Sequence, residues 1–348
     1  MIYINGRFLE QKLTGVQRFA KEISIHLSSI REDVIVLVSN LDNIDDNTIF
    51  ERLKVEELRG GSGHFWEQIT LPKFLISKGK PLLINLTSTA PVFYKNKIST
   101  HHDITYIRYP QSFSLSFRML YKILIPKILL SSKAVITVSE FSKNEICEYY
   151  KLNEDKVDVI YNAVSTVFLN STSEKMTSRP YLLAVSSPNY HKNFEGLIEA
   201  FSGLEIDIDL KIIGSLSSSF NKIEYDIKND PRVMFMGRVN DSELANLYKN
   251  AFCFVFPSFY EGFGIPPLEA QAQGCPVISS NAASMPEVLG NSVIYFNPND
   301  IEDIRQKLLD IFVNKEGRKR LIELGYKNIE RYSWANSAEK LNDIINEI

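Results

Sequence analysis

The chain has 348 residues, enough for two cores of ordinary size, because domains usually run to about 100–200 residues. A formal net charge of -3 gives no reason to expect nucleic acid as a partner, and a hydrophobic content of 44% excludes a disordered chain. The opening MIYINGRFLE does not read as a signal peptide, and no apolar run approaches the roughly 18–20 residues of a membrane span. We therefore expect a cytoplasmic protein.

Strands and helices alternate along the first half of the chain. Runs of β-branched residues bounded by polar residues predict strands over 33–40, 81–87, 134–140 and 156–162. Amphipathic segments predict helices over 15–30 and 141–150. This alternation is typical of parallel α/β layers.

A polar stretch without periodicity, 171–180, ends in a proline and marks the domain boundary. We place a first doubly wound domain over 1–172 and a second over 173–330. The last segment, 331–348, reads as a helix entered through Trp334, which either closes the second domain or packs back on the first.

The second half repeats the alternation, with helices predicted over 197–201 and 241–251. Strands are predicted over 181–187, 209–215, 233–237, 252–258, 275–280 and 292–297. The three cysteines lie far apart without metal-ligand or CxxC spacing, so we expect small buried residues at Cys147, Cys253 and Cys275.

Three loops lie where an open α/β sheet binds ligands, beyond the carboxyl ends of strands and before a helix. They are 14–23, 186–194 and the loop after strand 252–258. A helix N-terminus offers free N–H groups and a partial positive charge to an anion. Lys192, beside such a terminus, is a candidate phosphate ligand, although a lone lysine is more often a solvated surface group.

The stretch FPSFYEGFGIPPLEAQAQGCPVIS, residues 256–279, holds two glutamates in different settings. Two prolines suit the first turn of a helix, so the helix starts near them, after Glu261 and just before Glu269. This rigid turn argues against the paired carboxylates of a retaining glycosidase. One glutamate can instead hold a sugar and the other a ribose, while the amides of 262–265 face a diphosphate. Taken singly, each glutamate is also explained as a turn residue or as a charge favoured by the helix dipole.

Four motifs together resemble one enzyme family. They are EGFGIPPLE at 261–269, KN at 192–193, VSEFSKNEI at 138–146 and VIYNAV at 159–164. The chain resembles, over nearly its whole length, family 4 of the retaining glycosyltransferases, whose members commonly build bacterial surface polysaccharides. The resemblance implies the GT-B fold: two doubly wound Rossmann-like domains facing a central cleft, the first on the acceptor side and the second binding the nucleotide-sugar.

The resemblance also implies residue roles. Glu261 would contact hydroxyls of the transferred sugar, Glu269 the ribose, and Lys192 the diphosphate. His102 would lie near the transferred sugar, and Gly15 would approach the phosphates from the first domain. The remaining donor-binding candidates are Asn193, Gly262, Phe263, Gly264, Ile265 and Arg238.

One departure from the family pattern concerns charge on the leaving diphosphate. Many relatives carry an arginine a few residues before the lysine, whereas this chain has Ser187, Pro188 and Asn189 there. Arg238, His191 or backbone amides are the candidates to replace it.

The mechanism implied needs neither metal nor cofactor, because the nucleotide-sugar is a substrate. Cationic and N–H donors would stabilise charge on the departing phosphate. That phosphate would itself accept the proton of the acceptor hydroxyl, giving retention by front-face attack. Domain closure would exclude water from the donor.

The segment from Ile104 to Ser139 contains no acidic residue and is rich in apolar and aromatic side chains. Its basic residues are Arg108, Arg118, Lys122, Lys127 and Lys133. This composition suits the surface of an anionic membrane, and a buried helix with solvent-reaching lysines is the alternative. Pro126 is expected to end or kink the helix.

The predicted function is therefore a retaining hexosyltransferase acting on a glycan or lipid-linked acceptor. GDP-mannose is favoured over UDP- or dTDP-sugars from the resemblance alone. The protein would be cytoplasmic or peripheral on the inner face of the membrane. Two alternatives stay open: a GT-B sugar-nucleotide epimerase, and a non-catalytic subunit that binds a sugar-nucleotide.

Overall fold

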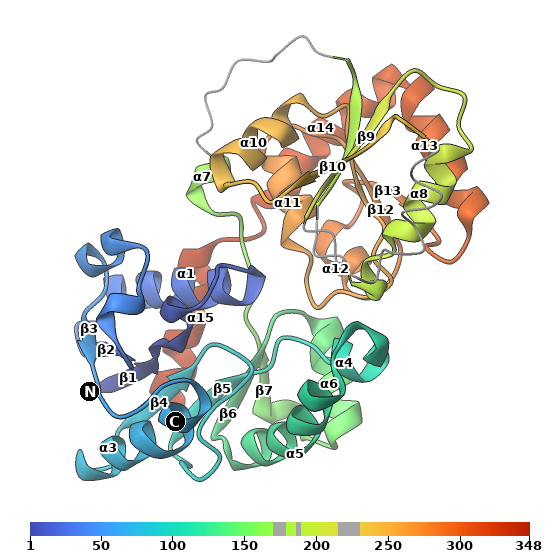
Figure 1. The fold of residues 1–348 in the computed structure, drawn as a ribbon. Coiled ribbons are helices and arrows are strands. Elements are labelled where there is room, and N and C mark those ends of the chain that lie inside the picture. The colour runs from blue at the N-terminus through green and yellow to red at the C-terminus, as the bar shows by residue number, and fades with distance from the viewer. Residues whose placement is uncertain (170–178, 186–188, 215–229) are drawn as a thin grey trace. The chain divides into compact units, whose positions relative to one another are not determined.

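The chain forms two compact units, described here from a computed structural model that covers residues 1–169, 179–185, 189–214 and 230–348 (Figure 1). Unit 1 comprises Met1–Ile104, Ser114–Asn162 and Ser333–Ile348, and unit 2 comprises Thr105–Phe113 and Ala163–Tyr332. The boundary expected at 172/173 falls within 170–178, outside the described residues.

Unit 1 is built on a seven-stranded parallel sheet in the order β3-β2-β1-β4-β5-β6-β7. The strands are β1 Ile2–Asn5, β2 Val34–Val38, β3 Val55–Glu57, β4 Leu82–Asn85, β5 Lys97–Thr100, β6 Ala134–Thr137 and β7 Val157–Val159. Four of these strands were predicted. The central β1 was missed because it is a four-residue run at the chain start, and β5 because its sequence KIST reads as polar although all four residues are buried.

Helices flank this sheet, and the predicted helices over 15–30 and 141–150 are confirmed. The helical segments of unit 1 are α1 Gly15–Ile30, α2 Gly63–Phe65, a π-helical turn Trp66–Thr70, α3 Leu71–Ser77, α5 Leu115–Ser131, α6 Glu140–Tyr150 and α15 Trp334–Glu347. Short 3-10 turns lie at Gly6–Glu10, Leu41–Asn43, Asn47–Glu51 and Glu154–Lys156.

Helix α5 continues through Pro126, so of the two outcomes expected there, an end or a kink, the end is wrong and the kink stays a prediction. A proline removes one backbone hydrogen bond from a helix. On both sides of it, Ile125, Ile128 and Leu129 are buried, and their packing holds the helical path where the sequence alone favours a stop.

Helix α15 packs against α1 in unit 1. The rings of Phe19 and Trp334 meet edge to face with centroids 6.1 Å apart. At the far end of the pair, Arg31 donates to the side-chain oxygens of Asn342 at 2.8 Å and Asn346 at 3.0 Å. The end of the chain thus completes the helical layer beside the first strands, one of the two arrangements expected from the sequence.

Unit 2 carries a six-stranded parallel sheet in the order β10-β9-β8-β11-β12-β13. Its strands are β8 Tyr181–Val185, β9 Asp209–Ile213, β10 Val233–Gly237, β11 Cys253–Phe256, β12 Val277–Ser280 and β13 Ile294–Phe296. All six coincide with predicted strands, because each is a short run rich in apolar residues. Burial is not common to all of them, since Met234 and Met236 of β10 are exposed. Its helices are α4 Thr105–Arg108, α7 Thr166–Leu169, α8 Phe194–Ser202, α10 Asp241–Asn250, α11 Ile265–Ala272, α12 Met285–Leu289, α13 Ile301–Val313 and α14 Lys315–Ile329, with 3-10 turns at Pro110–Ser112 and Tyr190–Lys192.

Both sheets reverse their strand order at one place. In unit 1 the reversal lies between β1 and β4, and in unit 2 it lies between β8 and β11. Loops that leave adjacent strands in opposite directions open a crevice at such a switch point, where doubly wound sheets bind their ligands. The topology therefore indicates one candidate ligand position in each unit.

The segment Thr105–Phe113 belongs to unit 2, although it lies between β5 and α5 in the chain. The ring of Tyr109 stacks on Phe259 with centroids 6.1 Å apart, and Phe113 stacks on His191 at 6.2 Å. These stacks explain the assignment, which the sequence did not indicate.

Both tryptophans of the chain, Trp66 and Trp334, lie in unit 1, so tryptophan fluorescence reports the unfolding of that unit. Leu341 of α15 is fully buried. We predict that Leu341→Ala lowers the unfolding free energy of unit 1 by about 2–5 kcal/mol in urea, since it leaves a cavity against α1. The exposed neighbour Lys340→Ala is the control. Equal midpoints for the two variants would contradict the packing of α15 on unit 1.

Candidate functional site

The switch point of unit 2 brings together two charged residues that lie 69 positions apart in the chain. Lys192 follows β8 in the turn Tyr190–Lys192, and Glu261 lies in the loop after β11. The ammonium of Lys192 contacts Oε1 of Glu261 at 2.6 Å, and both side chains are largely buried, with 15% and 13% of their surface exposed. The sequence assigned these residues to neighbouring parts of one ligand. The structure places them close enough to serve it together.

The loop that carries Glu261 is fixed by hydrogen bonds that the sequence did not reveal. Ser258 Oγ donates to Oε1 of Glu261 at 2.7 Å. Ser284 Oγ lies 2.9 Å from the backbone carbonyl of Glu261 and 3.2 Å from that of Phe263. Serines in polar loops are common, so no sequence signal singled these two out.

Gly264 closes the same loop in the left-handed region, with φ at +91°. A Cβ at this position would lie 2.5 Å from the terminal methyl of Met285. Both the backbone conformation and the lack of space therefore require glycine.

Helix α11 begins at Ile265 and carries its two prolines in the first turn, as predicted. Its N-cap residue is Gly264, which has no side chain to cap the helix, and the N-terminus is the positive end of the helix dipole. Glu269 is buried one turn into the helix and accepts a hydrogen bond from the hydroxyl of Tyr248 at 3.3 Å.

Asn193 joins the Lys192 turn to α8 in a left-handed conformation, with φ at +53°. Its side-chain amide donates to the carbonyl of Pro298 at 2.8 Å, so this side chain fixes the loop. A donor-binding role for Asn193 stays a prediction. Ser187 and Pro188, which stand where the family has its arginine, lie outside the described residues.

His191 cannot replace the missing cation. Its ring is buried, and its Nδ1 lies 2.9 Å from Ser112 Oγ. Burial, with a smaller contribution from the charge of Lys192, lowers the pKa of His191 to about 3, so the ring is neutral near neutral pH. Arg238, directly after β10, is exposed and remains a candidate.

Two predicted site residues lie in unit 1. His102 is buried, and its Nε2 lies 3.1 Å from the carbonyl of Leu86. A carbonyl can only accept, so Nε2 carries the hydrogen and Nδ1 carries the lone pair. Burial lowers the pKa of His102, which favours the neutral ring. Gly15 is exposed as the first residue of α1, and the side chain of the N-cap residue, Thr14, makes no capping hydrogen bond.

The three cysteines are free and buried, as predicted. Within the described ranges, no cluster of three histidine, cysteine or carboxylate side chains is suited to hold a metal ion. In the same part of the chain, no helix is both long and apolar enough to cross a membrane.

Two family profiles match the chain in succession. The profile described as Glycosyltransferase Family 4 matches residues 13–168, and the profile described as Glycosyl transferases group 1 matches residues 167–328. The O-antigen chain mannosyltransferase RfbU of Salmonella typhimurium is 31% identical, with 83% of this chain and 81% of that protein covered. The O-antigen chain mannosyltransferase B of Escherichia coli is 28% identical, covering 71% and 70%.

Solved structures match the whole chain at low identity. Sucrose-phosphate synthase from Thermosynechococcus elongatus superposes with a TM-score of 0.78 at 17% identity, covering 99% of this chain and 98% of that one. WaaG, a glycosyltransferase involved in lipopolysaccharide biosynthesis, gives 0.76 at 14% identity, with 99% of each chain covered. The predicted GT-B fold is confirmed. The two profiles and the similarity to RfbU make the class of protein a glycosyltransferase. Because the chain is 31% identical to RfbU over 83% of its length and matches both profiles, it belongs to family 4 of the glycosyltransferases.

We predict a pH dependence of stability from His191. An unfolded histidine has a pKa near 6.5, whereas burial holds this one near 3 in the folded state. Below pH 6.5 the unfolded chain therefore binds a proton that the folded chain does not, and stability is lost as pH falls toward 3.

Between pH 7.5 and 5.5 this loss amounts to about 1.4 kcal/mol, which His191→Gln removes. Urea unfolding followed by circular dichroism at the two pH values measures this loss. His191 lies in unit 2, whose unfolding tryptophan fluorescence does not report, so the transition to analyse is the one seen by circular dichroism alone. Equal losses in the variant and the wild type would contradict a buried neutral His191.

Proposed function

We propose that this glycosyltransferase moves mannose from GDP-mannose, with retention, to a glycan or lipid-linked acceptor in bacterial surface polysaccharide synthesis. The observation that carries the proposal is the Lys192–Glu261 ion pair at the switch point of unit 2, beside the uncapped N-terminus of α11. The names of the relatives, O-antigen mannosyltransferases, support mannose and polysaccharide. Family membership favours transfer over the epimerase and the non-catalytic subunit.

The ion pair suits a nucleotide-sugar because such a donor offers a partner to each residue. Its diphosphate is negative and suits Lys192, and its sugar carries hydroxyls that suit Glu261. On binding, the diphosphate takes the ammonium of Lys192 and releases the carboxylate of Glu261 to the sugar hydroxyls. The N-terminus of α11 and Arg238 add positive potential, which compensates for the missing arginine. Glu269, one turn further along α11, accepts from the ribose.

The chemistry follows from these positions. The bond between the anomeric carbon and the phosphate oxygen breaks, and the nucleoside diphosphate leaves with the electron pair. The acceptor hydroxyl attacks from the same face, and its proton passes to the departing phosphate. Lys192 and the helix N-terminus lower the barrier by stabilising negative charge on the leaving group. Neither a metal ion nor a cofactor takes part.

The proposal extends to the inner membrane surface through α5. This helix exposes apolar side chains on one side, while Ile125, Ile128 and Leu129 are buried on the other. A buried helix with solvent-reaching lysines, the alternative considered from the sequence, does not account for the exposed apolar side. The exposed apolar residues are Leu115, Met119, Leu120, Ile123 and Leu130. Phe93, next to the Val92 carbonyl that Ser131 of α5 contacts, is 92% exposed. Apolar side chains beside Arg118, Lys122 and Lys127 are typical of helices at an anionic interface.

We predict that Glu261→Ala abolishes mannose transfer and leaves GDP affinity largely intact. The carboxylate holds the sugar, whereas GDP lacks the sugar and needs Lys192, which the variant retains. Turnover of GDP-mannose and calorimetric titration with GDP measure the two effects, with the exposed Glu323→Ala on α14 as control. If GDP affinity fell as well, Glu261 would hold the nucleotide, and the roles assigned to Glu261 and Glu269 would be wrong.

We predict that exchanging Arg118, Lys122 and Lys127 for Glu releases the protein from anionic liposomes. Each basic side chain contributes about 1 kcal/mol near the headgroups, and the new charges repel. The control exchanges Lys315, Lys319 and Arg320 on α14 for Glu. Co-sedimentation at low and high salt follows attachment, because salt screens it. Activity on a water-soluble acceptor analogue should survive, and wild-type protein that ignores anionic liposomes at low salt would contradict the membrane role.

A further inference from the structure

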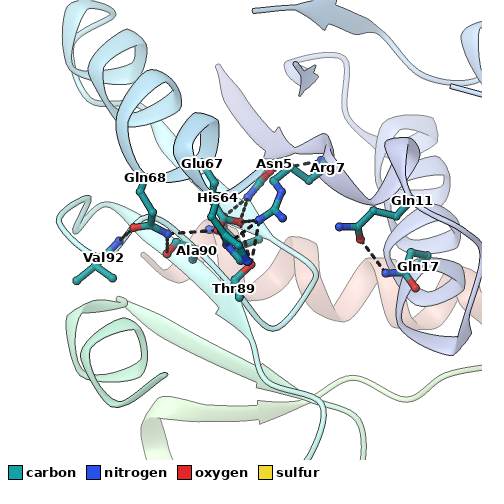
Figure 2. A network of polar contacts seen from close by, with 11 residues as sticks. Asn5, Arg7, Gln11, Gln17, His64, Glu67, Gln68, Thr89, Ala90 and Val92 are labelled. Atoms are coloured by element: carbon teal, nitrogen blue, oxygen red, sulfur yellow. Dashed lines mark hydrogen bonds and ion pairs between the residues drawn. The ribbon is translucent and has the colours of Figure 1, made fainter. Parts of the chain in front are cut away.

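The switch point of unit 1 holds a cluster of polar side chains that the donor site does not use (Figure 2). The cluster comprises Asn5, Arg7, His64, Glu67 and Thr89. Asn5 ends β1 and Arg7 follows it, while Thr89 lies just after β4, so the two strands that flank the reversal both contribute. The cluster occupies the ligand position of a doubly wound sheet, as Lys192 and Glu261 do in unit 2.

Glu67 is the centre of the cluster and is fully buried. Its Oε1 accepts from Arg7 Nη1 at 2.8 Å, from Thr89 Oγ1 at 2.9 Å and from Asn5 Nδ2 at 3.0 Å. Its Oε2 accepts from Gln68 Nε2 at 3.2 Å. Burial alone would raise the pKa of Glu67, but the hydrogen bonds from neighbouring side chains and the charge of Arg7 outweigh it and hold the pKa below its usual value. Glu67 is therefore ionised.

A buried ion pair is a costly way to stabilise a fold, because apolar side chains of similar size often do as well. Glu67 also lies in the π-helical turn Trp66–Thr70, and such turns occur frequently at functional sites. The residue before His64, Gly63, begins α2 with φ at +56°, a conformation that favours glycine. These features point to a ligand.

His64 is the outward-facing member of the cluster, with 49% of its side chain exposed. Its Nδ1 lies 3.4 Å from both Oε2 of Glu67 and Nη1 of Arg7. Arg7 already donates to Glu67 and to Thr89, so the ring hydrogen is best placed on Nδ1, facing the ionised carboxylate. Among the described residues, the hydrogen bonds and the ion pair given for the ring run through Nδ1, so Nε2 carries the lone pair.

We propose that this cluster is a hydroxyl-binding site for the acceptor, in which Nε2 of His64 accepts a hydrogen bond from a hydroxyl of the terminal acceptor sugar. The inference rests on the proposed glycosyltransferase function and names the acceptor site on unit 1. Arg7 and Glu67 neutralise each other, so the cluster suits an uncharged sugar and not a phosphate or a cation. Glu67 acts as a positioning residue, because it holds the His64 ring and does not reach the ligand itself.

Helix α5 also supports an acceptor site at this cluster. Tyr121 of α5 is electrostatically coupled to the cluster: burial, and then the charge of Glu67, raise the pKa of its hydroxyl to about 12. Tyr121 stays neutral, and it stacks on Phe117 with ring centroids 3.9 Å apart. The helix proposed to meet the membrane thus also borders the cluster, which suits an acceptor whose sugar end lies close to a lipid anchor.

The test uses full-length protein, GDP-mannose and a panel of octyl glycosides as uncharged acceptors with a short apolar tail. His64→Ala should raise the KM for the accepted octyl glycoside about 10-fold or more, the effect of losing one hydrogen bond in a built site. The melting temperature, GDP affinity and acceptor-free hydrolysis of GDP-mannose should stay unchanged, since His64 is half exposed and lies on unit 1. His64→Gln, whose amide oxygen can replace Nε2, should recover part of the loss.

Two further variants test whether Glu67 positions the His64 ring or only stabilises the fold. Glu67→Gln should raise the same KM while lowering the melting temperature, because it removes the charge that holds the ring. The matched control is His26→Ala on α1, a partly exposed histidine outside the cluster, which should behave as wild type.

An unchanged acceptor KM in His64→Ala would overturn the proposal, and so would an equal loss of donor hydrolysis. Wild-type protein that hydrolyses GDP-mannose yet glycosylates no octyl glycoside would overturn it as well, while leaving the proposed function standing. Failure to bind GDP or to turn over GDP-mannose would instead reject the proposed function.

Discussion

The ion pair between Lys192 and Glu261 is the constraint on which the proposed donor site depends. A charged side chain that is largely buried is costly unless a partner compensates it, and here each charge compensates the other at 2.6 Å. Ser258 and Ser284 fix the carboxylate loop, and Asn193 fixes the lysine turn through Pro298. Glycine at 264 permits the backbone path between the carboxylate and α11. The loops thus hold two opposite charges in readiness for a ligand that offers a partner to each.

The two units use the same strand order for different chemistry. In the donor site that we propose at the switch point of unit 2, the paired charges would separate on binding, because the diphosphate would pair with Lys192 and the sugar hydroxyls with Glu261. At the switch point of unit 1, Glu67 is enclosed by Arg7, Asn5, Thr89 and Gln68, so this anion stays where it is and orients His64. A charged, exchangeable site fits the donor, and a neutral, preformed site fits a sugar hydroxyl. This difference follows from side chains, because the strand order around the two switch points is the same in both units.

Local sequence patterns predicted the parts of the structure that depend on local physics. The strands of unit 2 were found because they are short apolar runs bounded by polar residues, and the start of α11 was found because two prolines mark a first turn. The strand β5 was missed because Lys97 sits inside it, fully buried with its ammonium bonded to the Tyr94 carbonyl and Ser131 Oγ, each at 2.7 Å. Such tertiary compensation leaves no trace in a short window. The pairing of Lys192 with Glu261 and the convergence of Arg7 with Glu67 join distant residues, so only the fold reveals them.

The central claim is that Lys192 stabilises the departing diphosphate, and its direct test is turnover of GDP-mannose in Lys192→Ala beside Lys192→Arg. The account predicts that Lys192→Ala lowers kcat about 100-fold or more, the typical effect of removing one charge-stabilising donor, and that Lys192→Arg restores part of it. Unchanged turnover in Lys192→Ala would place the diphosphate elsewhere and contradict the account.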